Sequence, residues 1–333
     1  MTMGNRSQRM LVSVLCVVLV LAALLALSTG STDVPVLQAF SDLISARDST
    51  NSLILAEIRL PRVLIAACVG VSLALAGAAL QGLLRNPLAE PGILGASNCA
   101  ALGAVLVLYF GLAGNWLMVP VAAVAGASVS VALLASLAGR HSGTLTVILA
   151  GVAISALAGA LIALALNFAP SPYAMHEIVF WLMGSVANRS MAELWFALPL
   201  MVTGWVLLLL SGTYLDALSL GEETASSLGF AGKRYLWQVL AGSALAVGAA
   251  VAVSGSIGFV GLVIPHILRP FVGNRPARLL LPSALAGACL VLFADVLTQV
   301  LPTTSELKLG VLTSLLGAPF FLHLVLKLRG KLL

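Results

Sequence analysis

Charged residues are scarce in this chain of 333 residues. They make up 9% of it, whereas a soluble globular domain has about a quarter. Apolar residues make up 60%, and the mean hydropathy is +1.10. So few charges cannot cover a water-soluble fold, and we predict that lipid is the solvent of this protein. The net charge of +5 is spread between apolar runs, which argues against a nucleic-acid partner.

The chain also lacks the short motifs that carry catalysis or bind metals. The nucleotide motif GxxxxGK[ST] is missing, since "FAGKRY" has Gly-Lys but neither the upstream glycine nor the hydroxyl residue. HExxH and GxSxG are missing too, and none of the four cysteines has CxxC spacing. The four histidines are scattered over different segments. We therefore expect a protein that is not an enzyme, binds no metal or cofactor, and leaves ATP to a partner subunit.

Ten apolar runs are long enough to cross a hydrocarbon layer of roughly 30 Å. The first run follows a basic N-terminus, but no clean small-x-small cleavage site follows it, so we interpret it as a retained helix. An even number places both termini on one side, and twelve basic residues against five make that side the cytoplasm. We predict an all-α polytopic membrane protein, one transmembrane domain over 1–333, with helices near 10–29, 62–84, 93–111, 116–138, 145–168, 194–214, 236–254, 256–273, 279–301 and 309–328.

Two parts of the chain show an internal similarity. The helices that carry it run in opposite directions in the predicted topology, which indicates an inverted repeat of the kind found in many transporters. A shift of 178 residues aligns four pairs, Gly70 with Gly248, Gly77 with Gly255, Pro87 with Pro265 and Gly95 with Gly273.

The segment 215–235 is the longest polar stretch on the predicted cytoplasmic side, and it holds the densest charge cluster in the chain. Ser219 is placed to cap a short helix, with Glu222 three residues on as in a capping box and Gly229 at the C-terminal end. Such a helix would suit docking of a soluble partner. The alternative is a solvated loop that only connects two helices.

Asp295 is the one acid that we place deep within an apolar run, "LVLFADVLTQV". An acid inside a membrane is a candidate proton relay. We find no second acid and no buried base at matching depth in the other runs. An aspartate that hydrogen-bonds to a neighbouring helix or terminus is therefore the favoured alternative.

Several stretches resemble a known family, the membrane subunits of type II ABC importers for iron–siderophore complexes, haem and vitamin B12. The resemblance runs from about residue 55 to the C-terminus and keeps the order and spacing of the segments. It implies a ten-helix homodimer in the bacterial inner membrane, two copies of a cytoplasmic ATPase, and a periplasmic or lipid-anchored binding protein. The matching stretches include "GAALQGLLRNPLAEPGILGAS", "GSIGFVGLVIPHILRPFVG", "LSLGEETASSLGF" and "ELKLGVLTSLLGAPFFLHLV".

The resemblance also implies roles for individual residues. In the family, two positions of each subunit form a cytoplasmic gate in the dimer. The first corresponds to Asn86 and Leu88 of this chain, and the second to Thr144 and Leu145. Arginines that dock the binding protein match Arg59 and Arg62, while the third falls on Gln299, with Lys308 nearby as a substitute. The coupling helices that seat on the ATPase match Leu218, Ser219, Leu220, Gly221, Glu222, Glu223, Ala225, Leu228 and Gly229.

The cargo that the resemblance implies is a bulky metal chelate, which passes between the fifth and tenth helices of the dimer near residues such as Asn167. Ferric siderophores or haem lead as candidates, and vitamin B12 is the alternative. Two other classes stay open on the residues alone. An ion-coupled secondary transporter also uses inverted repeats but needs coupling-ion ligands, and an intramembrane enzyme needs a catalytic constellation.

Overall fold

Helices make up all the regular secondary structure in the part of the chain that the structure describes. The computed structural model describes residues 5–30, 32, 34–45, 49–138, 144–302 and 307–329. No strand occurs within these ranges. The predicted all-α class is therefore confirmed.

Each of the ten predicted spans coincides with a helix of the structure. Seven described helices are long and apolar enough to cross a membrane, and three matching segments, Ala96–Tyr109, Val260–Val272 and Leu309–Leu324, are shorter. The ten-span topology therefore stays a prediction. The ten helices are α1 (Asn5–Ser28), α4 (Leu60–Leu83), α5 (Ala96–Tyr109), α6 (Met118–Ala138), α7 (Thr144–Asn167), α9 (Met191–Leu210), α12 (Gly232–Ser254), α13 (Val260–Leu268), α14 (Pro276–Val300) and α15 (Leu309–Arg329).

Local sequence signals explain where several helices begin. Ser190 accepts a hydrogen bond from the Glu193 amide while the Glu193 side chain bonds back, which is a capping box at the start of α9. The Ser171 hydroxyl oxygen accepts a hydrogen bond from the Ala174 amide and so caps the short helix α8 (Pro172–Leu182), which has a proline at its first position. Proline also stands at the first position of α14, where its missing amide hydrogen costs nothing.

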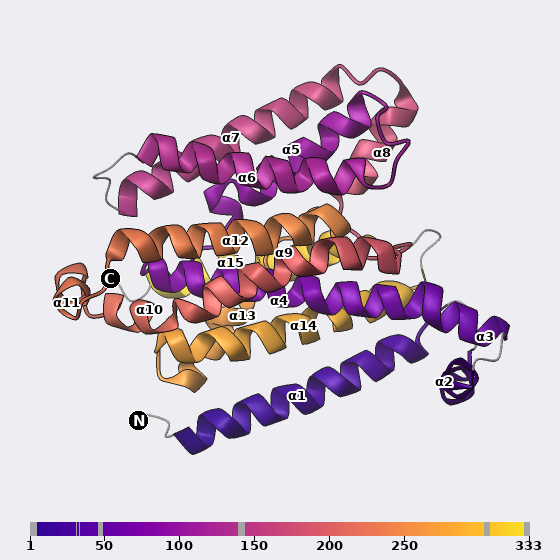
Figure 1. The fold of residues 1–333 in the computed structure, drawn as a ribbon, viewed down its shortest axis with the longest axis horizontal. Coiled ribbons are helices and arrows are strands. Elements are labelled where there is room, and N and C mark those ends of the chain that lie inside the picture. The colour runs from indigo at the N-terminus through magenta and orange to yellow at the C-terminus, as the bar shows by residue number, and fades with distance from the viewer. Residues whose placement is uncertain are drawn as a thin grey trace.

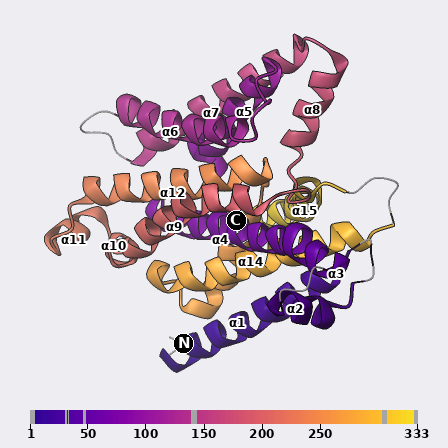
Figure 2. The same ribbon diagram turned by 45° about the vertical axis from the view of Figure 1, so that its right-hand side comes forward.

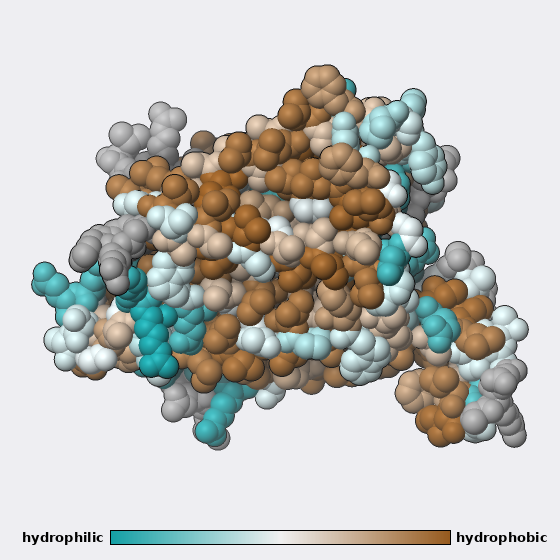
Figure 3. All heavy atoms as spheres, turned by 45° about the horizontal axis from the view of Figure 1, so that its top comes forward, coloured by the Kyte–Doolittle hydropathy of each residue, from teal (hydrophilic) through white to brown (hydrophobic). Residues whose placement is uncertain are grey.

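The long helices lie side by side, and the short ones gather at the two ends of the bundle (Figures 1 and 2). One end carries α2 (Val36–Ile44), α3 (Thr50–Leu53), the π-helix η1 (Ile54–Arg59) and α8, whereas α10 (Gly212–Leu218) and α11 (Glu222–Ser227) lie at the other. Figure 3 shows apolar side chains over the flank of the bundle and hydrophilic ones towards its ends, as lipid around the flank would require. Because α1 begins at the end with α10 and α11, we call it the cytoplasmic end, following the positive charges.

Glycines let the central helices approach at backbone distance. A Cβ atom added to Gly77 of α4 would overlap the carbonyl oxygen of Gly261 in α13. Gly70 of α4 meets Gly287 of α14 in the same manner. Small residues at such crossings supply packing where lipid gives no hydrophobic drive between helices. These contacts bury α4 in the centre of the subunit.

The predicted repeat is only partly reflected in local geometry. Gly95 and Gly273 both end a 3-10 helix in the left-handed conformation, with φ of 80° and 69°. The pair Pro87 and Pro265 is not equivalent, because the first lies in a turn and the second inside α13. The residue-by-residue shift of 178 therefore does not hold throughout, and the repeat itself stays a prediction.

Candidate functional site

The turn after α4, where the family resemblance implies one gate position, is a tight and locally bonded structure. The Asn86 side-chain oxygen accepts a hydrogen bond from the Leu88 amide at 2.9 Å, and the Asn86 amide bonds back to the Gln81 carbonyl at 3.2 Å. Arg85 has a positive φ of 48°, a conformation that few residues with a side chain adopt. Asn86 is exposed and Leu88 half-buried. The turn is thus held by its own backbone and can be displaced without unpacking the bundle.

The second gate position lies at the start of α7. Thr144 is the first residue of this helix, and its side chain lies outside the described part of the structure. The Leu145 side chain is 68% exposed. No contact joins Leu145 to Asn86 or Leu88 among the described residues of one subunit, and the gate role of all four stays a prediction.

The predicted coupling segment contains two short helices, α10 and α11, instead of one. The expected capping box is wrong: Ser219 lies after α10 and its hydroxyl donates to the Asp216 carbonyl at 2.6 Å. Gly221, with φ of 116°, precedes α11 and offers no side-chain cap. Because glycine adopts this conformation freely, the chain turns sharply here and starts the helix two residues later than a Ser219 cap requires.

The predicted C-terminal end of the short helix is confirmed. Gly229 has φ of 86°, its amide bonds to the Ser226 carbonyl at 2.9 Å, and the Phe230 amide bonds to the Ala225 carbonyl at 3.1 Å. This pair of bonds is a Schellman motif. Leu220 and Leu228 flank α11 and are 69% and 61% exposed. The segment therefore presents two apolar side chains beside a rigidly ended helix.

Polar contacts join the coupling segment to two other helices at the cytoplasmic end. Glu222, at the start of α11, lies 3.4 Å from Arg85, next to the gate turn. Asp216 of α10 accepts a hydrogen bond at 2.8 Å from the Ala277 amide, at the start of α14. A displacement of α10 and α11 would thus reach the ends of α4 and α14 directly.

An aromatic cluster joins the same segment to α12. Tyr214 of α10 stacks on Tyr235 of α12, with ring centroids 4.7 Å apart, and Phe230 packs against both. Burial raises the pKa of the Tyr214 hydroxyl, as does the charge of Glu222, while Arg85 acts against the shift. The phenol is therefore neutral at physiological pH and acts as a packing group.

At the opposite end, Asp295 forms a buried ion pair with Arg62. The Arg62 guanidinium meets both carboxylate oxygens at 2.9 Å, and the Gln299 amide donates to one of them at 2.9 Å. Asp295 is 1% exposed. We expected no base in the other apolar runs at the same membrane depth as Asp295, and this expectation is wrong. Arg62 is at the start of one run, Asp295 is near the end of another, and the two lie at the same depth. The pair supports the hydrogen-bonded role of Asp295 over a proton relay.

The three predicted docking residues are not brought together. Arg59 is 5% exposed, and its guanidinium donates to the carbonyls of Leu27 and Thr32 at 2.6 and 2.5 Å, which ties α1 to η1. Arg59 and Arg62 both line an outer hollow of about 560 Å³. The Lys308 ammonium instead lies 5.2 Å from the centre of the Phe180 ring of α8.

Two hollows meet between α7 and α15. The first, of about 520 Å³, is lined by α7, by Glu90 with the start of the 3-10 helix η2 (Pro91–Leu94), and by irregular backbone at Ser256–Phe259. The second, of about 820 Å³, is lined by α15 and the end of α8. Ser256 and Gly258 line both, so the two hollows are neighbours. Asn167, at the end of α7, lines neither.

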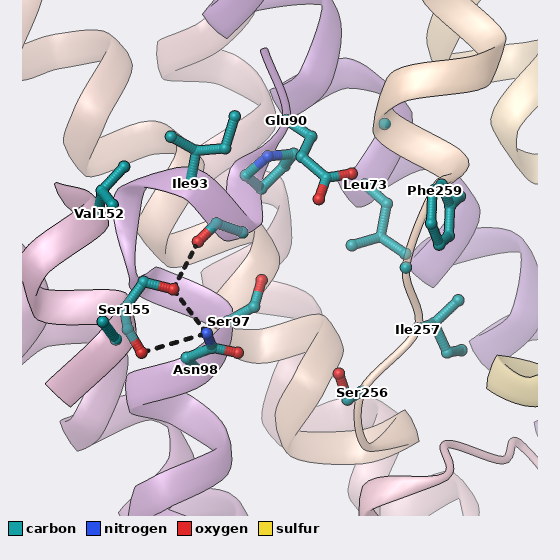
Figure 4. Close-up of a pocket in the computed structure, with 15 residues that line it drawn as sticks. Leu73, Glu90, Ile93, Ser97, Asn98, Val152, Ser155, Ser256, Ile257 and Phe259 are labelled. Carbon is teal, nitrogen blue, oxygen red and sulfur yellow. Dashed lines mark hydrogen bonds between the residues drawn. The ribbon is translucent and has the colours of Figure 1, made fainter. Parts of the chain in front are cut away.

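Figure 4 shows the polar wall of the first hollow, which sequence reasoning missed. The Asn98 amide donates to the Ser155 hydroxyl at 2.6 Å, and that hydroxyl donates to the Gly92 carbonyl at 3.1 Å. The Glu90 carboxylate faces the same space. The acid inside "NPLAEPG" is the sequence feature that could have indicated this polar wall. The segment "NPLAEPG" follows α4 and enters the bundle instead of staying at its surface.

Comparisons with known proteins agree on one family. The family model described as the FecCD transport family matches residues 18–327. The hemin transport system permease protein of Yersinia pestis is 38% identical, with 98% of each chain covered. The vitamin B12 import system permease protein of Salmonella typhi is 40% identical, with 97% of this chain and 96% of that one covered.

A solved structure agrees as well. A metal-chelate type ABC transporter in an inward-facing conformation is 34% identical and superimposes with a TM-score of 0.84, covering 96% of this chain and 99% of the other. The chain therefore belongs to the FecCD transport family, and it is the multi-pass inner-membrane permease subunit of an ABC importer of the metal-chelate, haem and vitamin B12 type.

Proposed function

We propose that two copies of this chain form the path by which a bulky metal chelate crosses from the periplasm to the cytoplasm. The observation that carries the proposal is the pair of neighbouring hollows, one beside α7 and one beside α15, where both helices keep large apolar side chains exposed. A second copy would cover those side chains and close the space into a channel. Candidate cargoes are ferric siderophores, haem and vitamin B12.

In this proposal, α11 receives the movement of an ATPase subunit. Glu222 of α11 contacts Arg85, just after α4, while Asp216 and Tyr214 of the preceding helix α10 contact α14 and α12. A rigid-body displacement of α10 and α11 would therefore move three central helices together. One ATPase subunit on each copy of the chain gives a complex with two of them.

The gate is proposed at Asn86 and Leu88, with Thr144 and Leu145 as its second part. Single cysteines at Asn86 or Leu88 should crosslink the two subunits when the path is closed towards the cytoplasm. Cysteine at Leu112, in the exposed loop after α5, is the matched control and should not crosslink. Crosslinks at the control alone would place the two-fold axis elsewhere.

The binding protein is proposed to dock at the outer end, around Arg59, Arg62 and Lys308. Charge reversal of the two arginines is a poor test, because Arg62 pairs with buried Asp295 and Arg59 fastens α1. Lys308→Glu changes a side chain whose ammonium lies over the Phe180 ring and forms no ion pair with a described residue. We expect slower association of the binding protein, with a smaller effect at high salt. An unchanged association rate would remove Lys308 from the docking surface.

The function as a whole is tested by reconstitution in vesicles with an ATPase subunit and a binding protein that copurify with this chain. Uptake of a ferric siderophore, haem and cyanocobalamin is measured with ATP and with a non-hydrolysable analogue. We expect uptake of one of these chelates only with ATP. Uptake that follows an imposed ion gradient without ATP would instead identify an ion-coupled transporter.

A further inference from the structure

Glu90 stands in an unusual place for an acid. It follows the gate turn in extended conformation, with φ of −139° and ψ of 160°, and leads into the 3-10 helix η2 (Pro91–Leu94). Its side chain is half-buried and lines the first hollow. Within the described ranges, no group donates a hydrogen bond to its carboxylate and no basic side chain pairs with it. The carboxylate therefore faces open space instead of a protein partner.

The position of Glu90 is close to the middle of the bundle. A Cβ atom added to Gly261 would lie 2.7 Å from the Leu73 carbonyl and 3.0 Å from Cδ of Pro91, the next residue after Glu90. Leu73 is central in α4, which runs from Leu60 to Leu83. Irregular backbone at this depth is tolerated where it is buried in protein or lines a cavity. An ionisable residue there is costly unless it serves a function.

The rest of the wall offers more hydrogen-bond acceptors than donors. The Asn98 amide hydrogens and the Ser155 hydroxyl are engaged with each other and with the Gly92 carbonyl, which leaves the Asn98 side-chain oxygen facing outward. Ser97 and Ser256 add hydroxyl groups (Figure 4). No lysine, arginine or histidine stands among the described residues of the lining. An acceptor-rich wall with one carboxylate favours N–H groups and cations and repels carboxylates.

We propose that the first hollow is a subsite at mid-membrane depth that binds amide, amine or other cationic groups of the passing chelate and disfavours carboxylates. The inference rests on the proposed function, since it assigns the hollow to the path of the cargo. A volume of about 520 Å³ holds a peripheral group and not a whole chelate. The subsite therefore favours chelates with a rim of amides, as in vitamin B12, over chelates whose rim carries carboxylates, as in haem.

The test uses charged thiol reagents and needs no cargo. Ser97→Cys is introduced into the full chain after replacement of Cys16, Cys68, Cys99 and Cys289, and the permease is reconstituted with its ATPase in nanodiscs. The modification rate is measured with a trimethylammonium and with a sulfonate methanethiosulfonate reagent. We expect Glu90 to favour the cationic reagent, and Glu90→Gln to lower the ratio of the two rates about tenfold, since a charged cleft raises the local concentration of counter-ions. Glu90→Asp keeps the charge and should keep the ratio.

Cysteine at Leu112 is the matched control, because this exposed side chain lies in the loop after α5 and outside the hollow. Its ratio of rates should not respond to Glu90→Gln. The subsite would be overturned if the ratio of the two modification rates at Ser97→Cys were the same with Glu90 and with Glu90→Gln. It would also be overturned if that cysteine reacted with neither reagent. Failure of chelate uptake in the vesicle assay would instead count against the proposed function, so the two results are separable.

Discussion

The two ends of the bundle hold their ion pairs in opposite ways. At the outer end, Arg62 and Asp295 come from helices far apart in sequence, and their side chains are 16% and 2% exposed. At the cytoplasmic end, Arg85 and Glu222 are 48% and 61% exposed and lie 3.4 Å apart. A buried bidentate pair cannot open without stranding a charge, whereas water and salt replace an exposed pair at little cost. The outer end is thus fastened, and the cytoplasmic end is free to rearrange.

This difference suits an importer driven from the cytoplasm. The segment that would receive the movement is held by its own backbone bonds and by an aromatic cluster, all of which can travel with it. The outer end provides the fixed point against which α4 and α14 move. The following changes test that division, from the largest expected effect to the smallest.

Asp295→Ala should have the largest effect on stability. Arg62 would lose its carboxylate partner inside the bundle, and we expect a loss of about 3–5 kcal/mol, seen as a lower melting temperature in detergent. The double variant Arg62→Met with Asp295→Leu replaces both charges by apolar groups and should recover most of the loss. A single variant as stable as the wild type would show that the pair does not fasten the outer end.

Ala225→Pro should break α11 and separate ATP hydrolysis from transport. Proline there removes the bond from the Ala225 amide to the Gly221 carbonyl, 3.0 Å long, at a cost of about 3 kcal/mol. The variant should insert and fold, because the lost bond lies outside the spanning helices, but lose stimulated ATP hydrolysis and uptake together.

The control for that variant is Ala225→Gly, which keeps the backbone amide that bonds to the Gly221 carbonyl. Glycine inside a helix costs about 1 kcal/mol relative to alanine, much less than proline. Transport should therefore largely persist in Ala225→Gly. Normal uptake in Ala225→Pro would show that energy enters the subunit by another route.

Gly229→Ala should have a smaller effect, which comes from backbone conformation alone. No atom lies within 4 Å of an added Cβ, but φ of 86° disfavours alanine by about 1 kcal/mol. We expect a modest loss of stimulated ATP hydrolysis. Gly159→Ala inside α7 also has open space and should be neutral or slightly stabilising. Equal effects of the two changes would exclude a special role for the end of α11.

Arg85→Gln should have the smallest effect. Exposed ion pairs contribute about 0.5 kcal/mol or less to the free energy of unfolding. We therefore expect the same melting temperature for the wild type and the variant, at low and at high salt. A loss comparable to that of Asp295→Ala would contradict the comparison of the two ends.

Local features of the structure could be predicted well from the sequence. The ten helices, and the glycine that ends α11, each depend on residues within about four positions of one another, and those neighbours are visible in the chain. The prediction of a capping box at Ser219 was wrong, because the backbone turns at Gly221 and the helix begins after that residue. Both outcomes were decided locally, and only the competition between two local signals was misjudged.

Contacts between distant segments could not be predicted in this way. Arg62 and Asp295 are 233 residues apart, and nothing in either apolar run shows which side of its helix faces the other. Arg59 was expected at a docking surface but lies beneath the connection after α1. Glu90 was passed over because a loop in sequence was assumed to be a loop at the surface.

The sequence by itself determined that this is a helical membrane protein of the importer family, because hydropathy, spacing and motif are properties of neighbouring residues. Only the tertiary structure decided which polar side chains are paired and which face a cavity. The reason is that the rotation of each helix about its own axis is set by backbone contacts at glycines such as Gly77 and Gly261. The contact between Gly70 and Gly287 holds α4 against α14, the helices that carry Arg62 and Asp295, whereas Glu90 lies in extended backbone and lines the hollow beside α7.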